Sequence, residues 1–411
     1  MNWRRQLLLA GAVTTAWCAD IDSAAVLSRV RDKVITDAKK IPRYVCRQKI
    51  ERREFVRYSK TASGCGTLDG AGRPNASSGF RLLSADRANL DVMLAEGTEL
   101  FSWPGGHRFD AANPGDLLAS GMAGSGDFAS FLIDIFSLGR VTFQYQGACG
   151  DSCISFGYDV PVEASHYVLE TPFDKVTVAY HGTFDVDTRT ADLVRMMILP
   201  VDLRNKLKDV CAIRTRMTYA RMTMQSVEFM IPAETEKGLL LRDGSYFENR
   251  ISYESCQQYK SESVLTFGDD SPNANSTHRP KAPPAPPLAG TELQLRLVSK
   301  INSETDSAGD ALEATLLHGI PNTQGQMIAA GTIVRGHVAQ LQRLYAPRKE
   351  IIVAIRFDTI VLGDTPVRLT LEPTGKRDQR GRGVFVFPGD RVVVSRYWVS
   401  RWLVRSSSGA E

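Results

Sequence analysis

Two aspartates separated by one residue, Asp185 and Asp187, form the first pattern with chemical potential, in the stretch AYHGTFDVDTRTADLVRM. A D-x-D pair at the end of a buried parallel strand can supply the nucleophile and the acid of a magnesium-dependent hydrolase. That chemistry needs a strand buried on both faces. Residues 176–185 instead alternate between apolar and polar side chains, which is typical of a sheet with one face in solvent. The run D-T-R-T from Asp187 favours a tight turn. The pattern therefore predicts a hairpin, and a metal-dependent hydrolase using both aspartates is the alternative.

The polar side of this alternation carries His181 and Asp185, which we expect to face solvent. A metal site built on this pair is disfavoured, because four strand residues separate the two side chains by ~13 Å. The remaining histidines fall in no H-E-x-x-H or H-x-H pattern. The chain also lacks a G-x-S-x-G nucleophile elbow. We therefore predict that the protein is not an enzyme and has no catalytic residue, metal or cofactor.

Six of the seven cysteines lie between residues 46 and 256, and none follows. An even number of cysteines in an exported chain predicts three disulfides, and the spacings leave their pairing open. Two of them, four residues apart, can close a hairpin locally. The absence of a C-x-x-C pair disfavours a zinc finger. The disulfide candidates are Cys46, Cys65, Cys149, Cys153, Cys211 and Cys256.

The beginning of the chain has the composition of an export signal. A basic start, MNWRR, precedes a short apolar core and small residues. This core is shorter than the roughly 20 residues that cross a bilayer, and no later segment is apolar for long enough. We predict a signal peptide at residues 1–19 and a periplasmic or secreted protein. Cys18 offers a lipid anchor as the alternative, which Trp17 disfavours because a small residue is expected before a lipidated cysteine.

Helical periodicity occurs twice before residue 267. Apolar residues recur at three- and four-residue steps in residues 23–40, with Asp22 or Ser23 as the cap, and again in residues 124–139. The rest alternates as strands and hairpins without regular helical crossovers. Residues 20–267 are therefore predicted to be an α+β, mostly antiparallel unit, a curved sheet or half-barrel with two helices.

Proline, asparagine and serine dominate residues 268–290, which predicts a disordered linker. Residues 291–374 alternate in five short strands with turns at about 10-residue spacing, typical of a small β-barrel or sandwich. Residues 375–411 hold eight Lys or Arg against three Asp or Glu. This basic aromatic tail is interpreted as terminal strands or as a strip that binds a membrane or a polyanion. The whole-chain charge of +4 is small, so nucleic acid is not an expected partner.

Four stretches make residues 22–267 resemble an uncharacterised group of exported bacterial proteins: RYVCRQKIERREF, YHGTFDVDTRTADLVRM, FMIP and NRISYESCQQYKSESVLTF. In that group an early cysteine follows a short helix and a late cysteine closes the sheet, so the resemblance implies a Cys46–Cys256 disulfide. The order of helix, strands and inserted helix is similar to the half-barrel of lipoprotein carriers of the LolA/LolB type. The second unit, through AGTELQLRLV and MIAAGTIVRGHVAQL, resembles the β-barrel domain of TrbI-like conjugation-channel components, without their transmembrane anchor.

These patterns predict a non-enzymatic binding or assembly protein of the cell envelope. Its sheet would present an apolar face to a lipid, a lipidated protein or another envelope partner. Methionine adapts to irregular ligands, so methionines on the strands are candidates for that face. An ordinary core is the competing interpretation, and a purely structural component of an envelope complex is the third. The candidate ligand-binding residues are Met217, Tyr219, Met222 and Met224.

Overall fold

The computed structural model describes most of the chain from residue 22 onward. The predicted signal peptide, Cys18 and most of the predicted linker lie outside the described residues. No described helix is long and apolar enough to cross a membrane. The described residues are 22–40, 44–57, 65, 79–95, 98–106, 109, 111–118, 121–126, 130–137, 139–171, 174–224, 227–258, 284–374 and 383–405.

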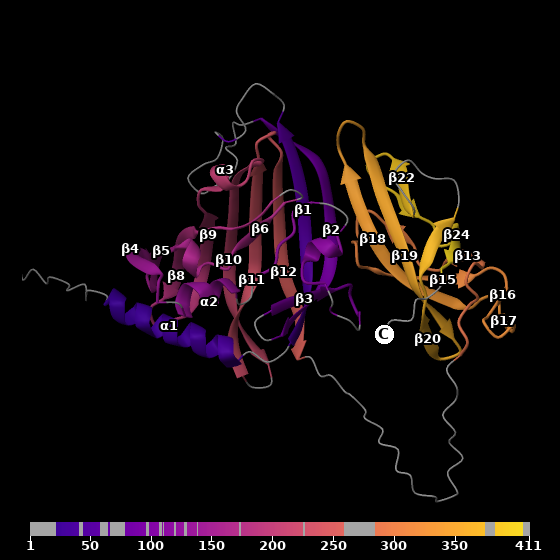
Figure 1. Ribbon diagram of the computed structural model, residues 1–411, viewed down its shortest axis with the longest axis horizontal. Helices are drawn as coiled ribbons and strands as arrows, with labels where there is room; N and C mark the ends of the chain where they lie inside the picture. Colours follow the sequence, from indigo (N-terminus) through magenta and orange to yellow (C-terminus); the bar gives the residue numbers. More distant parts are fainter. Residues whose placement is uncertain are drawn as a thin grey trace, which may run out of the picture.

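Helices are few and strands are many, and the sheets are antiparallel, so the predicted α+β, mostly antiparallel class is confirmed (Figure 1). The helices are α1 Ser23–Lys40, α2 Ser130–Ser137 and α3 Leu203–Lys206. The N-terminal strands are β1 Tyr44–Arg57, β2 Phe80–Ala95, β3 Thr98–Ser102, β4 Thr142–Gly150, β5 Cys153–Val160, β6 Val168–Glu170, β7 Lys175–Thr177, β8 Tyr180–Asp187, β9 Leu193–Pro200, β10 Val210–Met224, β11 Val227–Leu241 and β12 Tyr246–Gln258. The C-terminal strands are β13 Glu292–Leu297, β14 Ile301–Asn302, β15 Ala311–Leu316, β16 Ile320–Pro321, β17 Met327–Ile328, β18 Ile333–Leu344, β19 Glu350–Leu362, β20 Thr365–Arg368, β21 Leu371–Thr374, β22 Val384–Pro388, β23 Val393–Val394 and β24 Val399–Val404.

The N-terminal sheet has the strand order β2–β1–β12–β11–β10–β9–β8–β5–β4. The first strand of the chain therefore lies inside the sheet, between the second strand and the last one of this part. The hairpins β2–β3, β4–β5, β8–β9 and β10–β11 occur where the alternation predicts them. One prediction is wrong: residues 176–185 are not one strand. β7 pairs with β6 in a separate small sheet, and β8 begins only at Tyr180.

Both predicted helices are present and cover one face of this sheet (Figure 1). Asp22 caps α1, because its Oδ1 accepts a hydrogen bond from the backbone N–H of Ala25 at 3.0 Å. Val26 and Val30 of α1 are buried against the sheet. α2 lies within the stretch that the pattern predicts and buries Ile135 and Phe136 in the same core. One hydrophobic core thus joins both helices to strands β5, β8, β9 and β10.

Three disulfides are present in the N-terminal part, as the cysteine count predicts, and two of them join segments far apart in the sequence. They join Cys46 to Cys256, Cys65 to Cys211 and Cys149 to Cys153. The first links β1 to β12, and it is the pairing that the resemblance implies. The third closes the β4–β5 hairpin.

The C-terminal strands surround a core of their own, which contains the fully buried Trp402. β24 pairs with both β13 and β21, so part of the basic tail is integral to this core. Trp398 packs edge-on against Phe385, with ring centroids 4.6 Å apart. Residues 383–405 are therefore strands and turns, and residues 375–382 and 406–411 lie outside the description.

The C-terminal part continues the N-terminal sheet along the edge of β2 (Figure 1). β18 pairs with β2 in the register Gln342↔Asp86. Next to it, the backbone N–H of Ala308 donates to the carbonyl of Arg87 at 2.9 Å. Gly309 makes this approach possible, because a Cβ there would lie 2.2 Å from the Asn89 carbonyl oxygen. The last residues of the predicted linker, 284–290, also contact the C-terminal strands. The domain boundaries at 267 and 290 stay a prediction.

We expect the Cys46–Cys256 disulfide to stabilise the fold more than the Cys149–Cys153 disulfide. With Cys65–Cys211 intact, the first bridge closes a loop made of residues 46–65 and 211–256, whereas the cysteines of the other are four residues apart. Loop-closure entropy then assigns about 4 kcal/mol to the first and about 2 kcal/mol to the second. Urea unfolding of the two double serine variants under oxidising conditions measures both losses. Equal losses would contradict this assignment.

Candidate functional site

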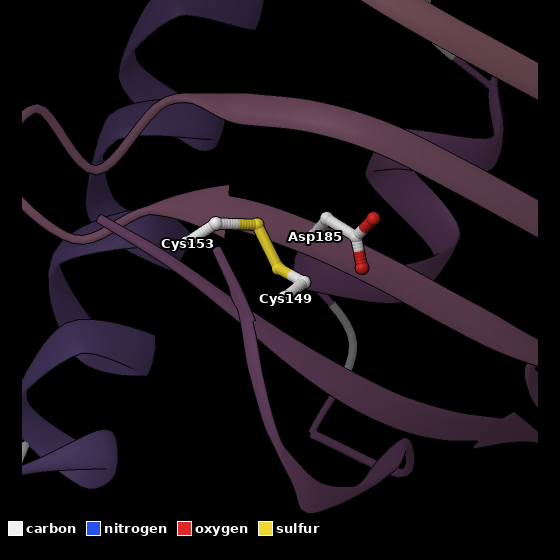
Figure 2. A group of neighbouring side chains, drawn as sticks. All are labelled: Cys149, Cys153 and Asp185. Atoms are coloured by element: carbon white, nitrogen blue, oxygen red, sulfur yellow. A yellow bond between two sulfur atoms is a disulfide. The ribbon is translucent and has the colours of Figure 1, made fainter. Parts of the chain in front are cut away.

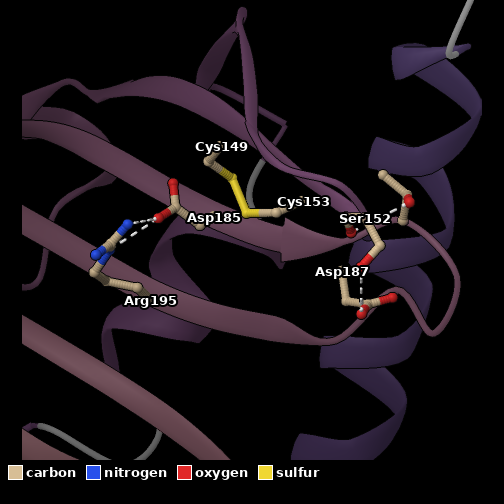
Figure 3. Close-up of a disulfide and its surroundings, with 7 residues drawn as sticks. Cys149, Ser152, Cys153, Asp185, Asp187 and Arg195 are labelled. Atoms are coloured by element: carbon tan, nitrogen blue, oxygen red, sulfur yellow. Dashed lines mark hydrogen bonds and ion pairs between the residues drawn. A yellow bond between two sulfur atoms is a disulfide. The ribbon is translucent and has the colours of Figure 1, made fainter.

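Asp187, the second aspartate of the D-x-D motif, forms the β8–β9 turn. Its Oδ1 accepts hydrogen bonds from the backbone N–H groups of Thr190 at 3.0 Å and Arg189 at 2.8 Å. Its Oδ2 lies 3.5 Å from the Ser152 hydroxyl (Figure 3). The bond from Thr190 contributes most to lowering the pKa of Asp187 below its ordinary value. The prediction of a tight turn is confirmed.

Asp185, the first aspartate, has a different environment. It faces away from the helices, as the alternation predicts, but it is only 6% exposed. The prediction that it lies in solvent is therefore wrong. Arg195 on β9 donates to its Oδ2 through Nε at 2.8 Å and through a second nitrogen. The Cys149–Cys153 disulfide lies on its other side (Figure 3). The two aspartates thus bind separate partners and do not form a carboxylate pair.

The sulfurs of Cys149 and Cys153 and a carboxylate oxygen of Asp185 lie within 4.8 Å of one another (Figure 2). This is the only such group of potential metal ligands among the described residues. The two sulfurs are bonded to each other, and a metal ligand must be a thiolate. The carboxylate of Asp185 already forms an ion pair with Arg195. The arrangement therefore does not fit a metal ion.

The β8–β9 turn also holds helix α1, and we call residues 187–192 the clasp turn. Arg29 donates to the carbonyl of Thr188 at 2.7 Å, and Lys33 donates to the carbonyl of Thr190 at 2.7 Å. Lys33 also forms an ion pair with Asp192 at 2.6 Å. The D-x-D region is thus a structural element that attaches the helix to the rim of the sheet.

Asp192 is the charged centre of the clasp turn. Arg221 on β10 donates to both of its carboxylate oxygens, at 2.8 and 2.6 Å, in addition to the contact from Lys33. Partial burial raises the pKa of Asp192. Hydrogen bonds from Lys33, Thr190 and Arg221 lower it by more than burial raises it, so the pKa lies below its ordinary value. The ionised carboxylate therefore stabilises the contact between the helix and the sheet.

A small crevice of about 20 Å³ lies between α1, α2 and the sheet, next to the clasp turn. Tyr219 borders it, whereas Met217 is fully buried in the core beneath. Met222 packs at a neighbouring core, and the side chain of Met224 lies outside the description. Met230, another of the strand methionines expected to line an apolar face, also borders the crevice. Its lining includes Lys33, Val34, Leu132, Leu193, Tyr219 and Met230.

Asp134 on α2 is a residue that the sequence patterns missed. Its carboxylate accepts from the backbone N–H of His166 at 2.9 Å and contacts Nδ1 of that ring at 2.6 Å. The Tyr180 hydroxyl donates to it at 3.3 Å, and burial together with this carboxylate raises the pKa of Tyr180. The signal in the sequence that could have identified Asp134 is its place as the single acidic residue in the apolar run FLIDIF. Its contacts show a structural role, anchoring α2 to the sheet.

No family model matches this chain, and no curated protein matches it by sequence. Among solved structures, a DUF1329 family protein from Desulfovibrio piger aligns with 58% of this chain and 95% of its own, at 11% sequence identity and a TM-score of 0.25. A likeness at this TM-score carries no argument about fold or function.

Replacing Asp187 tests whether the D-x-D motif is structural. We expect Asp187→Ala to lower the free energy of unfolding by about 1–2 kcal/mol, because two backbone N–H groups lose their acceptor. Asp187→Asn keeps an acceptor oxygen for the same turn and is the matched control, with a loss below about 1 kcal/mol. Urea unfolding measures both values. Equal destabilisation by the two variants would contradict the turn role.

The lowered pKa of Asp192 predicts a pH dependence of stability. The stabilisation is fully present above the ordinary carboxyl pKa of 3.8 and is lost as the pH falls through the lowered folded-state value. Asp192→Asn carries no such ionisation. The difference in unfolding free energy between the wild type and this variant should therefore shrink as the pH falls below 3.8. Urea titrations across this range measure it, and a constant difference would refute the claim.

Proposed function

We propose that the protein is a cell-envelope binding protein that holds an acyl chain or a similar hydrophobic group between α1 and the sheet. The observation that carries this proposal is the crevice beneath α1. Its walls are mainly apolar, with Val34, Leu132 and Met230 among them, and the charged side chains Lys33, Asp37 and Asp192 complete the lining. At about 20 Å³ it does not hold such a ligand as it stands. Binding therefore requires α1 to move away from the sheet.

The energetics of that movement favour a long aliphatic ligand. Displacing α1 uncovers Val26 and Val30, which are buried against the sheet. Exposing two such side chains costs about 3–6 kcal/mol, and each buried methylene of a ligand returns about 0.8 kcal/mol. Because Leu27, Val34 and Ile35 of α1 also pack against this core, at least about eight methylenes are needed to offset the loss. An acyl chain of ordinary lipid length exceeds this number, whereas a small metabolite does not reach it.

Two further features support a location in the envelope. Three disulfides fit a chain that folds in an oxidising compartment. The second feature is a helix that covers one face of a curved sheet, an arrangement similar to that of carriers of the LolA/LolB type. Because a shared fold does not transfer function, the crevice and not the likeness supports the proposal. In this proposal the C-terminal strands form a small barrel that serves assembly or binding.

Weakening the attachment of α1 should increase uptake of a hydrophobic probe. Lys33→Ala removes the contacts to Thr190 and Asp192. We expect this variant to bind a fluorescent long-chain fatty acid about tenfold faster than the wild type. Lys49→Ala is the control, because Lys49 pairs with Glu254 on the face away from α1.

Native mass spectrometry of the full chain purified from a periplasm gives the second readout. We expect excess mass that disappears on denaturation and identifies the acyl species. Met230→Asp places a charge in the crevice and should abolish both this mass and probe binding. A wild-type protein that is free of ligand and also fails to bind the probe would end the proposal.

A further inference from the structure

A second, larger cavity of about 290 Å³ opens on the face of the sheet that points away from the helices. Strands β8, β9 and β10 contribute its walls. We call it the arginine pocket, because three of its six lining residues are arginines. Those residues are Thr183, Asp185, Arg195, Met197, Arg214 and Arg216.

The carboxylates around the arginine pocket do not balance its cations. Asp185 is bound by Arg195. Glu236 on β11 lies near three arginines: Arg214 at 3.9 Å, Arg216 at 3.4 Å and Arg250 at 3.4 Å. Arg250 also pairs with Glu234 at 3.0 Å, but Arg214 and Arg216 share Glu236, and one carboxylate cannot give a bidentate partner to both. The pocket therefore carries excess positive charge beside Arg214 and Arg216.

Arg214 is the residue at which this imbalance is greatest. Its side chain is only 3% exposed, and its Nε has no hydrogen-bond partner among the described residues. The 3.9 Å separation from Glu236 exceeds a hydrogen bond. The neighbouring Tyr246 hydroxyl interacts with Arg214 but brings no charge, because burial raises its pKa more than Arg214 lowers it. Arginine does not lose its proton when buried, so its charge needs a partner that the chain supplies only in part.

We propose that the arginine pocket binds a phosphate group. Arg214 and Arg216 are two residues apart on β10, so both side chains project from the same face of the sheet. Their planar forks present paired N–H donors, which suit the oxygens of a phosphate. The Thr183 hydroxyl adds an uncharged hydrogen-bond donor. Met197 forms an apolar wall, and the volume leaves space beside the phosphate for the organic part of an ester.

Calorimetric titration of the full-length protein with inorganic phosphate at low ionic strength tests the site. We expect binding to the wild type and a loss of about tenfold or more in affinity for Arg216→Gln. Arg250→Gln is the matched control, because Arg250 contacts the same Glu236 but does not line the pocket. It should change the affinity by less than about twofold.

Thr183→Ala provides a second variant that leaves every charge in place. It should weaken phosphate binding several-fold without altering the salt dependence. Absence of phosphate binding to the wild type would overturn the proposal, and so would equal losses in Arg216→Gln and Arg250→Gln. Acetate binding as tightly as phosphate would also overturn it.

Two further titrations distinguish the source of the phosphate group. Glycerol 3-phosphate probes a soluble ester, and vesicles that contain phosphatidylglycerol probe a lipid headgroup. Tighter binding of the soluble ester, lost in Arg216→Gln, supports a free ligand. Vesicle co-sedimentation that Arg216→Gln abolishes and Arg250→Gln preserves supports a headgroup.

Discussion

The pairing of β1 with β12 is the constraint on which the rest of the structure depends. Among the strands that the structure describes, β1 pairs with β2 and β12, so without the second pairing β2 would separate from the strands that carry the helices. The C-terminal part is attached through β2, and its position depends on the same pairing. Bringing together strands about 200 residues apart has a loop-closure cost, and the Cys46–Cys256 disulfide lowers it in the oxidised chain.

Features that are local in sequence could be predicted. Helix α1 matches residues 23–40, because its apolar periodicity and the cap at Asp22 lie within one segment. The hairpins at 95–98 and 187–193 follow from turn residues between alternating runs. The break between β7 and β8 could not be predicted in this way. The alternation continues through it, and the separate pairing of β7 with β6 is set by tertiary contacts.

The buried charges were the second limit of prediction. Asp185 and Arg214 lie on the polar side of an alternating strand, where a charged residue is normally solvated. The disulfide hairpin and Arg195 cover the first, and the second lies beside Tyr246 and Glu236. These covering groups come from other strands, so no spacing within β8 or β10 reveals them. The crevice beneath α1 is likewise lined by residues from several elements. The sequence could therefore predict an apolar strand face but not the crevice itself.

The two proposed sites share one set of strands. Phe184, Met196 and Met217 point to the helix-covered core, while Asp185 and Arg195, their neighbours in β8 and β9, point to the opposite face. A slip of one residue would exchange the two faces. Gly182 fixes the close approach of β8 and β9, because a Cβ there would lie 1.8 Å from the Met197 carbonyl oxygen. The sheet therefore separates an apolar compartment from a cationic one by a single layer of backbone, and a ligand of one site has no direct contact with the other.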